Sequence, residues 1–242
     1  MGVVYRITGW GQPLGIGATG AVYAQVSAIC KKNGQCPYYV PNELVAAEIG
    51  RILRLPVPPG FIVLDANQTA HYASLDFNLT GVALPPIIPG NFIASFQPDL
   101  ASIVVFDILI ANPDRHAGNL SADYNSLSFN LFDHSHSLLG WGLSGTGVAV
   151  LQNAQNSVVV GSGHAVISGV NDENLLLRAI ERVESIPDFY IQSVVREAAQ
   201  YGLSAAESTG LEHFLLNRRG QMRNLISSNK GLFPGVSHWG AL

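Results

Sequence analysis

Hydrophobic and polar side chains alternate from Val22 to Lys31, a two-residue period that is typical of a β-strand. The dipeptide Asn33-Gly34 then indicates a turn. Shorter strands are expected at Gly60–Leu64 and His71–Phe77. The pattern therefore predicts a mainly β region over the first ninety residues, interrupted by one helix.

That helix is expected from Asn42 to about Leu55, where the pattern changes to helical spacing. Apolar side chains recur there at steps of three and four residues, with Pro41 before the segment and Pro56 behind it.

The second half of the chain is predicted to be largely helical. The segment from Pro98 to Ala111 is too apolar on all sides to lie on the surface, so we expect a buried helix. Ser204 and Glu207 have the spacing of a capping box at the start of the last helix. The remaining elements are two short strands, near Leu120 and at Ser128–Phe132, and three closing helices, near 173–185, 187–201 and 205–228.

Two segments lack such patterns. The 38 residues from 134 to 171 contain no Asp, Glu, Lys or Arg, and we expect a long loop in which short strands can form. Residues 84–90 are rich in Pro and Gly and are the candidate hinge between two lobes. The expected domains are thus an N-lobe at 1–90 and a C-lobe at 91–242.

Composition narrows the class of protein. Hydrophobic residues make up 48% of the 242 residues, enough for a sizeable core, while charged residues are only 12%. No cluster of Lys and Arg predicts direct nucleic-acid binding. Two cysteines are too few for a disulfide framework, and neither a signal peptide nor a membrane span is expected, so we predict a cytoplasmic protein.

A glycine motif, G-x-G-x-x-G-x-V, runs from Gly15 to Val22 and leads into the alternating strand. Glycines let backbone N–H groups approach phosphate oxygens closely. A strand follows the motif where a dinucleotide site would have a helix, so the motif favours a kinase-type flap. The candidate nucleotide-binding residues are Gly15, Gly17, Thr19 and Gly20.

Lys31 ends the strand that follows the flap. A Lys in this place can contact the phosphates of ATP, and it requires an acidic partner. Glu43 and Glu48 on the next helix are both candidates; they differ by about 140° around the helix axis, and we prefer Glu43. On local sequence alone, Lys31 and Lys32 could equally be solvated turn residues.

The most informative segment follows the buried helix and runs from Asn112 to Leu120. Asp114 and Asn119 have the D-x-x-x-x-N spacing of a kinase catalytic loop, in which the Asp accepts the proton of the substrate hydroxyl and the Asn binds Mg²⁺. His116 lies between them and is a further candidate catalytic residue.

Asp133 follows an apolar strand fourteen residues beyond Asn119 and is the second candidate Mg²⁺ ligand. His134 and His136 come directly after it. Active-site and purely structural roles are both open for these two histidines.

The order of these motifs, together with the runs Pro41–Pro58, Phe106–Leu120 and Phe132–Leu138, resembles the HipA-like kinases, bacterial relatives of the phosphoinositide and protein kinases. The resemblance implies a two-lobed α+β fold of the protein-kinase type, with a small, mainly β N-lobe that has one helix and a larger, mainly α C-lobe. The chain looks like a short form without the family's extra N-terminal domain, and its late motif reads Asp-His-Ser.

The resemblance further implies ATP and Mg²⁺ as cofactors and transfer of a phosphoryl group to a Ser or Thr hydroxyl on a protein. By position, Asp114 corresponds to the catalytic base, Asn119 and Asp133 to the metal ligands, and Lys31 and Glu43 to the phosphate-binding pair. A protein substrate is the expected partner, and a regulatory protein is a further one that the family allows.

Two other functions fit parts of the sequence. An inactive pseudokinase would bind nucleotide or a partner through the same motifs. A metal-dependent hydrolase would use as ligands Asp114, His116, Asp133, His134 and His136, but it leaves the glycine motif and Lys31 without a role.

Overall fold

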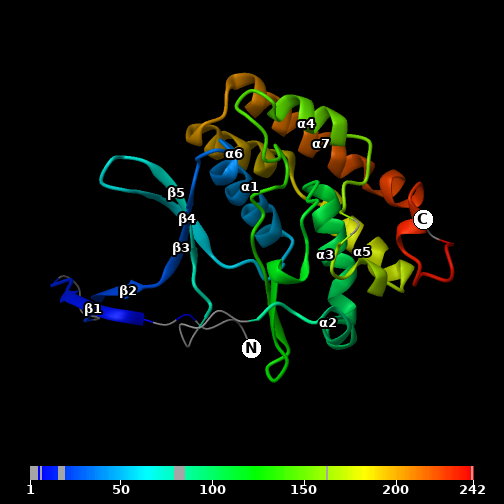
Figure 1. Cartoon of the computed structure of the whole chain (residues 1–242), viewed down its shortest axis with the longest axis horizontal. Coiled ribbons are helices and arrows are strands. Elements are labelled where there is room, and N and C mark those ends of the chain that lie inside the picture. Colours follow the sequence, from blue (N-terminus) through cyan, green and yellow to red (C-terminus); the bar gives the residue numbers. More distant parts are fainter. Residues whose placement is uncertain (1–4, 6, 16–19, 79–84, 162, 241) are drawn as a thin grey trace.

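The computed structural model describes residues 5, 7–15, 20–78, 85–161, 163–240 and 242. Within them, a region of β-sheet and a larger group of helices lie side by side, and the helix α1 (Tyr39–Ile52) packs between the two (Figure 1). The predicted α+β class is confirmed, with two of the three described sheets in the first third of the chain and most helices in the rest.

Five strands make up the first region. β1 (Ile7–Pro13) and β2 (Val22–Val26) form an antiparallel hairpin that projects away from the helices (Figure 1). A separate antiparallel sheet has the order β3-β5-β4, with bounds Ala28–Lys32 for β3, Gly60–Leu64 for β4 and Ala70–Leu75 for β5. The alternating stretch that predicted one strand is therefore two strands, which break at Ser27 and pair in different sheets.

The helix α1 begins three residues earlier than predicted. Pro41 lies in its first turn, where a missing backbone N–H costs no helical hydrogen bond. Nearby, the side chain of Asn33 accepts a hydrogen bond from the N–H of Val40 at 2.9 Å. Almost the whole helix is buried, because it packs against β3 and β5 as well as against the C-terminal helices.

The larger region is built around the buried helix α3 (Gln97–Leu109), which contacts two of the C-terminal helices. The short helix α2 (Pro89–Ser95) precedes it, and the hairpin of β6 (Leu120–Asp123) and β7 (Ser128–Leu131) follows it. The closing helices match the prediction within a few residues and are α5 (Glu173–Glu184), α6 (Asp188–Ala198) and α7 (Ala205–Ser227). Short 3₁₀ turns occur at Ala117–Asn119, Ile167–Gly169, Ala199–Tyr201 and Lys230–Leu232.

The uncharged segment contains a helix that the sequence did not predict, α4 (Gly147–Ala154), which packs on α7. The prediction of a long loop over 134–171, in which short strands can form, was therefore wrong at this helix. The candidate hinge at 84–90 lies partly outside the described residues, and α2 begins inside it at Pro89. The lobe boundary at residue 90 stays a prediction.

Within the described part of the chain, no single helix has the length and apolar character needed to cross a membrane. The pair formed by α2 and α3 meets those two criteria jointly but is bent by 114° between its halves.

Candidate active site

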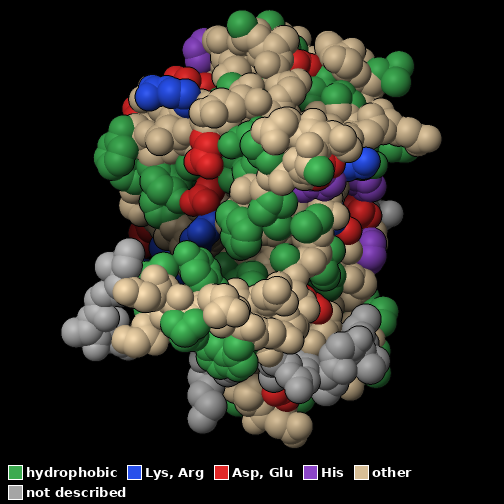
Figure 2. Space-filling view, turned by 90° about the vertical axis from the view of Figure 1, so that its left-hand side faces the viewer, with side chains coloured by type: hydrophobic (Ala, Val, Ile, Leu, Met, Phe, Trp, Pro, Cys, Tyr) green, Lys and Arg blue, Asp and Glu red, His purple; other side chains and the backbone are tan. Residues whose placement is uncertain are grey.

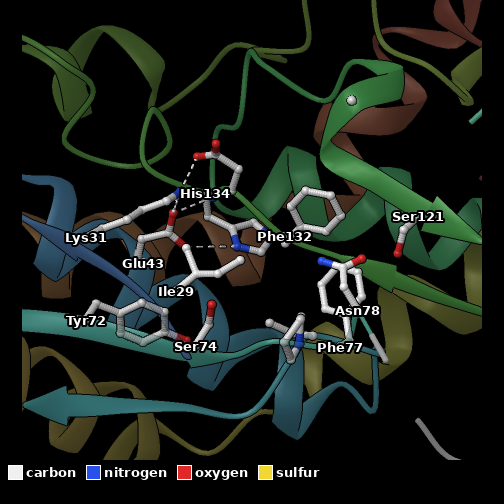
Figure 3. Close-up of a pocket in the computed structure, with 14 residues that line it drawn as sticks. Ile29, Lys31, Glu43, Tyr72, Ser74, Phe77, Asn78, Ser121, Phe132 and His134 are labelled. Carbon is white, nitrogen blue, oxygen red and sulfur yellow. Dashed lines mark hydrogen bonds and ion pairs between the residues drawn. The ribbon is translucent and has the colours of Figure 1, made fainter. Parts of the chain in front are cut away.

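The candidate site is organised around the ammonium group of Lys31, at the end of β3. Its Nζ lies 2.5 Å from Oε1 of Glu43 and 2.6 Å from Oδ1 of Asp133, and it also donates to Oγ of Ser135 at 2.9 Å. Figure 3 shows Lys31 and Glu43 meeting from β3 and α1, next to His134 of the segment after β7. One cation thus joins residues that are up to 104 positions apart in the sequence.

The expected pairing of Lys31 with Glu43 is present in the structure. Glu43 is almost fully buried on the face of α1 that points toward the cluster. Glu48, the alternative partner, faces elsewhere: its carboxylate binds Arg51 at 2.5 Å and accepts a hydrogen bond from Tyr190 at 3.0 Å. The periodicity of the helix therefore decides which of the two carboxylates reaches Lys31.

His134 holds the other side of Glu43. Its backbone N–H donates to Oε1 at 3.0 Å, and its ring Nδ1 lies 3.5 Å from Oε2. Burial lowers the pKa of the His134 imidazole, although the bond with Glu43 opposes this, so the ring is neutral near pH 7. Nδ1 then carries the proton that faces Glu43, and Nε2 is a free acceptor.

Both carboxylates of the cluster are ionised. Burial alone would raise the pKa of Glu43, but its hydrogen bond with His134 and the charge of Lys31 outweigh burial and hold this pKa well below its usual range. The pKa of Asp133 is lowered in the same way, since Lys31 outweighs the effect of burial. With one ammonium and two carboxylates, the cluster keeps a net negative charge that favours a further cation.

Asp133 has a left-handed backbone conformation, with φ of 58°. Asp tolerates this region better than most residues, at a modest cost in free energy. Lys31 and Ser135 both bind its Oδ1, so Oδ2 is the oxygen left for another ligand. The strained backbone directs this carboxylate toward the cavity described next.

A cavity of about 320 Å³ opens between the sheet and the segment around Asp133. Figure 2 shows a hollow on this side of the molecule, bordered by hydrophobic side chains, with a Lys or Arg side chain inside it. Ile29, Tyr72 and Phe132 supply apolar walls, and Lys31, Glu43 and Asp133 lie together in its lining. An apolar pocket that ends in a few converging charges is the usual form of a small-molecule site.

Two buried polar atoms that have no hydrogen-bond partner belong to residues of this cavity: Oγ of Ser121 and Nε2 of His134. Buried polar atoms are nearly always bonded, so their presence indicates a ligand that has polar groups of its own. The donor set is therefore suited to a nucleotide, with polar atoms along the apolar cavity and charged groups at one end.

The catalytic-loop segment is fixed by Arg115, which is fully buried. Its guanidinium makes two bonds of 3.0 Å to the carboxylate of Asp107 on α3. Its Nη1 also donates to the carbonyl oxygens of Asn119 and Phe132, each at 2.9 Å. Arg115 thereby ties the Asn119 backbone to the residue before Asp133, which brings the two candidate Mg²⁺ ligands into one region.

The Asn119 side chain has a defined orientation, because its Nδ2 donates to the carbonyl oxygen of Asp114 at 2.8 Å. A carbonyl can only accept, so the amide oxygen of Asn119 is the atom left for a metal. Mg²⁺ prefers a few protein oxygens together with phosphates and water. Asn119 and Asp133 therefore fit the ion that the sequence implies.

Asp114 is half-exposed and does not belong to the described lining of this cavity. Its Oδ2 is 3.2 Å from Nδ1 of His136, and its Oδ1 is 3.9 Å from Nε2 of His116. His116 is more exposed than His136, and its Nδ1 accepts a hydrogen bond from the N–H of Gly118 at 2.9 Å. The described contacts of His116 thus suit a role in shaping the loop, and a catalytic role stays a prediction.

The glycine motif is only partly described, since Gly17 and Thr19 lie outside the described residues. Gly15 and Gly20 have positive φ angles of 70° and 63° and lie at the two ends of the connection between β1 and β2. Neither belongs to the described lining of the cavity. A strand on each side of the motif is the arrangement of a kinase flap, and contact with a nucleotide stays a prediction.

Several residues of the site were missed by the sequence reasoning: Asp107, Arg115, Ser135 and His164. Asp107 offered a signal, as an acidic residue in the middle of a long apolar run. It is fully buried and bonded to Arg115, to Nδ2 of Asn112 at 2.8 Å and to Nε2 of His164 at 3.2 Å. A charge in an otherwise apolar helix requires such partners.

The ligand set of the alternative hydrolase does not come together. Asp114 contacts His116 and His136, whereas Asp133 binds Lys31 and His134 binds Glu43. Among the residues that the structure describes, no group of three His, Cys, Asp or Glu side chains is arranged to hold a metal ion.

The sheet, the buried α1 with its Glu43, the loop after α3 and the helical region together define a protein-kinase-like fold. Among solved structures, the chain is similar to the crystal structure of a Helicobacter pylori proinflammatory kinase, CtkA, with a TM-score of 0.62 and 16% sequence identity. The match covers 90% of this chain and 93% of that one. No protein-family model and no curated protein sequence matches the chain.

Proposed function

We propose that the protein is an ATP- and Mg²⁺-dependent kinase of the HipA-like type, which transfers the γ-phosphoryl group of ATP to a Ser or Thr hydroxyl on a protein. The observation that carries the proposal is the contact of Lys31 with both Glu43 and Asp133 at the charged end of an apolar cavity. A phosphate-binding Lys, its acidic partner and a metal-binding Asp are the groups that a kinase assembles around the phosphates of ATP.

Each residue has a distinct part in this reaction. The ammonium of Lys31, positioned by Glu43, binds phosphate oxygens, and the oxygens of Asn119 and Asp133 hold the metal. Bound ATP and Mg²⁺ supply the phosphoryl group and the charge that stabilises its oxygens. Asp114 orients the acceptor hydroxyl and takes its proton as the hydroxyl oxygen bonds to the γ-phosphorus. The bond from that phosphorus to the β–γ bridging oxygen breaks in the same step, and ADP leaves.

Most of the rate acceleration in such a reaction comes from positioning and from charge stabilisation, not from covalent chemistry by the protein. The structure suits this, because Arg115 fixes the loop and the Lys31 cluster is held by several hydrogen bonds. The match to a solved kinase of similar length supports the proposal through its fold.

Intact-mass measurement after incubation with ATP and Mg²⁺, alone and with casein as a generic acceptor, tests the proposal. We expect a gain of phosphate on the protein or on the acceptor, and loss of that gain in Asp114→Ala. Asp123→Ala, at the exposed last residue of β6, is the matched control.

Undiminished transfer by Asp114→Ala would refute the assigned base. ATP binding without transfer to either acceptor would instead favour a pseudokinase. Binding of ATP by the Asp114→Ala variant, followed by calorimetry, separates a loss of chemistry from a loss of folding.

A further inference from the structure

A second cavity, of about 370 Å³, lies beside the candidate catalytic loop. Its walls are formed mainly by Leu138, Trp141, Val150 and Val159, and His136 is the one titratable residue in its described lining. Trp141 is 71% exposed, so a large aromatic ring stands at the surface where protein–protein contacts often have their strongest anchor.

Two residues of the cavity lining are direct neighbours of Asp114, the candidate base. Pro113, which directly precedes Asp114, belongs to its lining. His136 also lines it, and Nδ1 of His136 is 3.2 Å from Oδ2 of Asp114. Gly118, at the other end of the same loop, lines the first cavity. The loop thus has one end on each cavity, with Asp114 next to the second.

A buried arginine holds the part of the cavity wall that α4 forms. The fully buried Arg218 on α7 donates hydrogen bonds to the carbonyl oxygens of Ala154, Gln155 and Ser157, at the end of α4 and just beyond it. It also binds the carbonyl of Ile108 on α3 at 2.7 Å. One guanidinium therefore anchors α4, which carries Val150 and Ala154 of the lining.

We propose that this second cavity binds a bulky apolar side chain of the protein segment that presents its Ser or Thr to Asp114. The proposal rests on the kinase function proposed above and names the chemistry of its acceptor. The acceptor hydroxyl has to lie within hydrogen-bond reach of Asp114, and an extended chain advances about 3.3–3.6 Å per residue. A side chain within about three residues of the hydroxyl therefore reaches the cavity.

The chemistry of the lining selects this occupant. No Asp, Glu, Lys or Arg occurs between residues 134 and 171, the segment that supplies most of the wall. A charged side chain would lose water here without gaining an opposite charge. Burial of one Leu or Phe side chain, in contrast, corresponds to roughly tenfold or more in affinity.

Fluorescence anisotropy with labelled peptides tests the inference. Each peptide has one Ser among Ala and Gly residues, with a single Phe placed at one of the three positions on either side of the Ser; the reference peptide has Ala in its place. The assay contains no nucleotide, so it measures peptide binding to the second cavity independently of phosphoryl transfer. We expect at least one Phe peptide to bind about tenfold more tightly than the reference.

Two variants of the cavity and two matched controls locate the effect. Trp141→Ala removes the exposed ring, and Val159→Phe fills the space. The controls are Phe189→Ala, which removes an equally exposed ring on α6, and Val63→Phe, which enlarges a half-buried Val on β4. We expect the preference for Phe to fall about fivefold or more in both cavity variants and to persist in both controls.

Equal affinities for the Phe and Ala peptides would overturn the inference, as would an unchanged preference in both cavity variants or an equal loss in the controls. In a separate assay with ATP and Mg²⁺, phosphoryl transfer to both peptides without any preference would leave the kinase function standing and refute the cavity as an acceptor site. Preferential peptide binding, without transfer to the peptides, to casein or to the protein itself, would support the cavity as a binding site and refute the kinase function. Thermal unfolding of each variant confirms that the fold is intact, and either cavity variant alone is sufficient for the test.

Discussion

His134 and Glu43 are joined twice, by a backbone N–H that lies 3.0 Å from Oε1 and by a ring nitrogen that lies 3.5 Å from Oε2. The residue after Asp133 thus holds the acidic residue of α1 that in turn holds Lys31. His134 also packs edge-on against Phe106 of the buried helix, with ring centroids 5.5 Å apart. An imidazole at this place can connect α1, α3 and the segment after β7, because it is apolar on its faces and polar at its nitrogens.

Replacing this histidine should alter the pH dependence of stability. The folded state keeps His134 neutral below its usual pKa of about 6.5, while the unfolded state takes up a proton, so stability falls as the pH drops below about 6.5. In His134→Phe this contribution, at most about 1.4 kcal/mol per pH unit, should disappear. Urea unfolding between pH 5 and 7.5 measures the slope, with His213→Phe, at an exposed position on α7, as control. Equal slopes in wild type and His134→Phe would contradict the assignment of a neutral ring.

The pair of Lys31 and Glu43 should matter more than the neighbouring pair on the same helix. Glu43→Gln leaves a partly buried ammonium with only one carboxylate, and breaking a buried ion pair typically costs about 3–5 kcal/mol. Glu48→Gln affects a surface pair with Arg51, which is worth about 0–1 kcal/mol. The free energy of unfolding at pH 7 should therefore fall much further in the first variant. A similar loss in both would show that position on α1, and not the Lys31 cluster, determines the cost.

Acid should destabilise the protein through its buried carboxylates. The folded state lowers the pKa values of Glu43, Asp107 and Asp133, so their stabilisation is present above the unfolded values near 4 and is lost as the pH falls through the folded ones. Asp107→Asn should be less stable at pH 7 and should lose less further stability between pH 4.5 and 2.5. Denaturant titrations at several pH values test this. If Asp107→Asn lost as much stability between pH 4.5 and 2.5 as the wild type, Asp107 would not be ionised in the folded state.

Arg115 should be irreplaceable even by lysine. The lysine ammonium cannot make the paired bonds to Asp107 and also reach the carbonyls of Asn119 and Phe132. We expect Arg115→Lys to lose about 2–5 kcal/mol of stability and to weaken Mg²⁺-dependent ATP binding. Calorimetry with and without Mg²⁺ measures this, and Arg51→Lys, in a surface pair on α1, is the matched control. If a folded Arg115→Lys protein bound ATP with wild-type affinity, the loop would be positioned without the hydrogen bonds of the Arg115 guanidinium.

Arg218 should control the local stability of α4. Burial lowers its pKa to about 10, so it stays protonated at neutral pH, where it donates hydrogen bonds to carbonyl oxygens and lies over the Phe214 ring. Arg218→Lys keeps the charge but supplies fewer donors in a different geometry. Amide hydrogen exchange over residues 147–157 should then accelerate by about tenfold or more, with the protection of α5 retained. If amide exchange accelerated equally along the whole chain, the variant would be destabilised globally and not only at α4.

Much of the fold could be predicted because local patterns and tertiary contacts agree. The strand at Gly60–Leu64 and the last helix, with its capping box at Ser204 and Glu207, follow from periodicity and from side-chain chemistry. The spacing of Asp114, Asn119 and Asp133 likewise points to the region where the backbones of Asn119 and Phe132 meet at Arg115, while the metal-binding roles stay predictions. The alternation of residues 22–31, however, continues through a change of partner strand at Ser27, and periodicity does not reveal which strand is the partner.

The missed features depend on contacts between distant residues. The helix α4 lies in a Gly- and Val-rich segment, and it is stabilised by packing on α7 and by Arg218, some sixty residues later in the chain. No local signal marks Arg218 as a buried cation, because its partners are backbone carbonyls that every residue possesses. The bonds of Ser135 to Glu43 and Asp133 depend in the same way on the positioning of three separate segments.

The hydroxyl of Tyr38, next to the first residue of α1, donates to the capping-box residue Glu207 of α7 and accepts from the N–H of Gly147 at 3.2 Å. Further along α1, Asn42 donates to the carbonyl oxygens of Ser135 and Gly140. These bonds fasten the helix that carries Glu43 to the C-terminal half of the protein, although it precedes strands β4 and β5 of the N-terminal sheet in sequence. Because α1 is held to that half, any displacement of β3 relative to it would change the distances from Lys31 to Glu43 and Asp133, so these two ion pairs couple the position of the sheet to the C-terminal half.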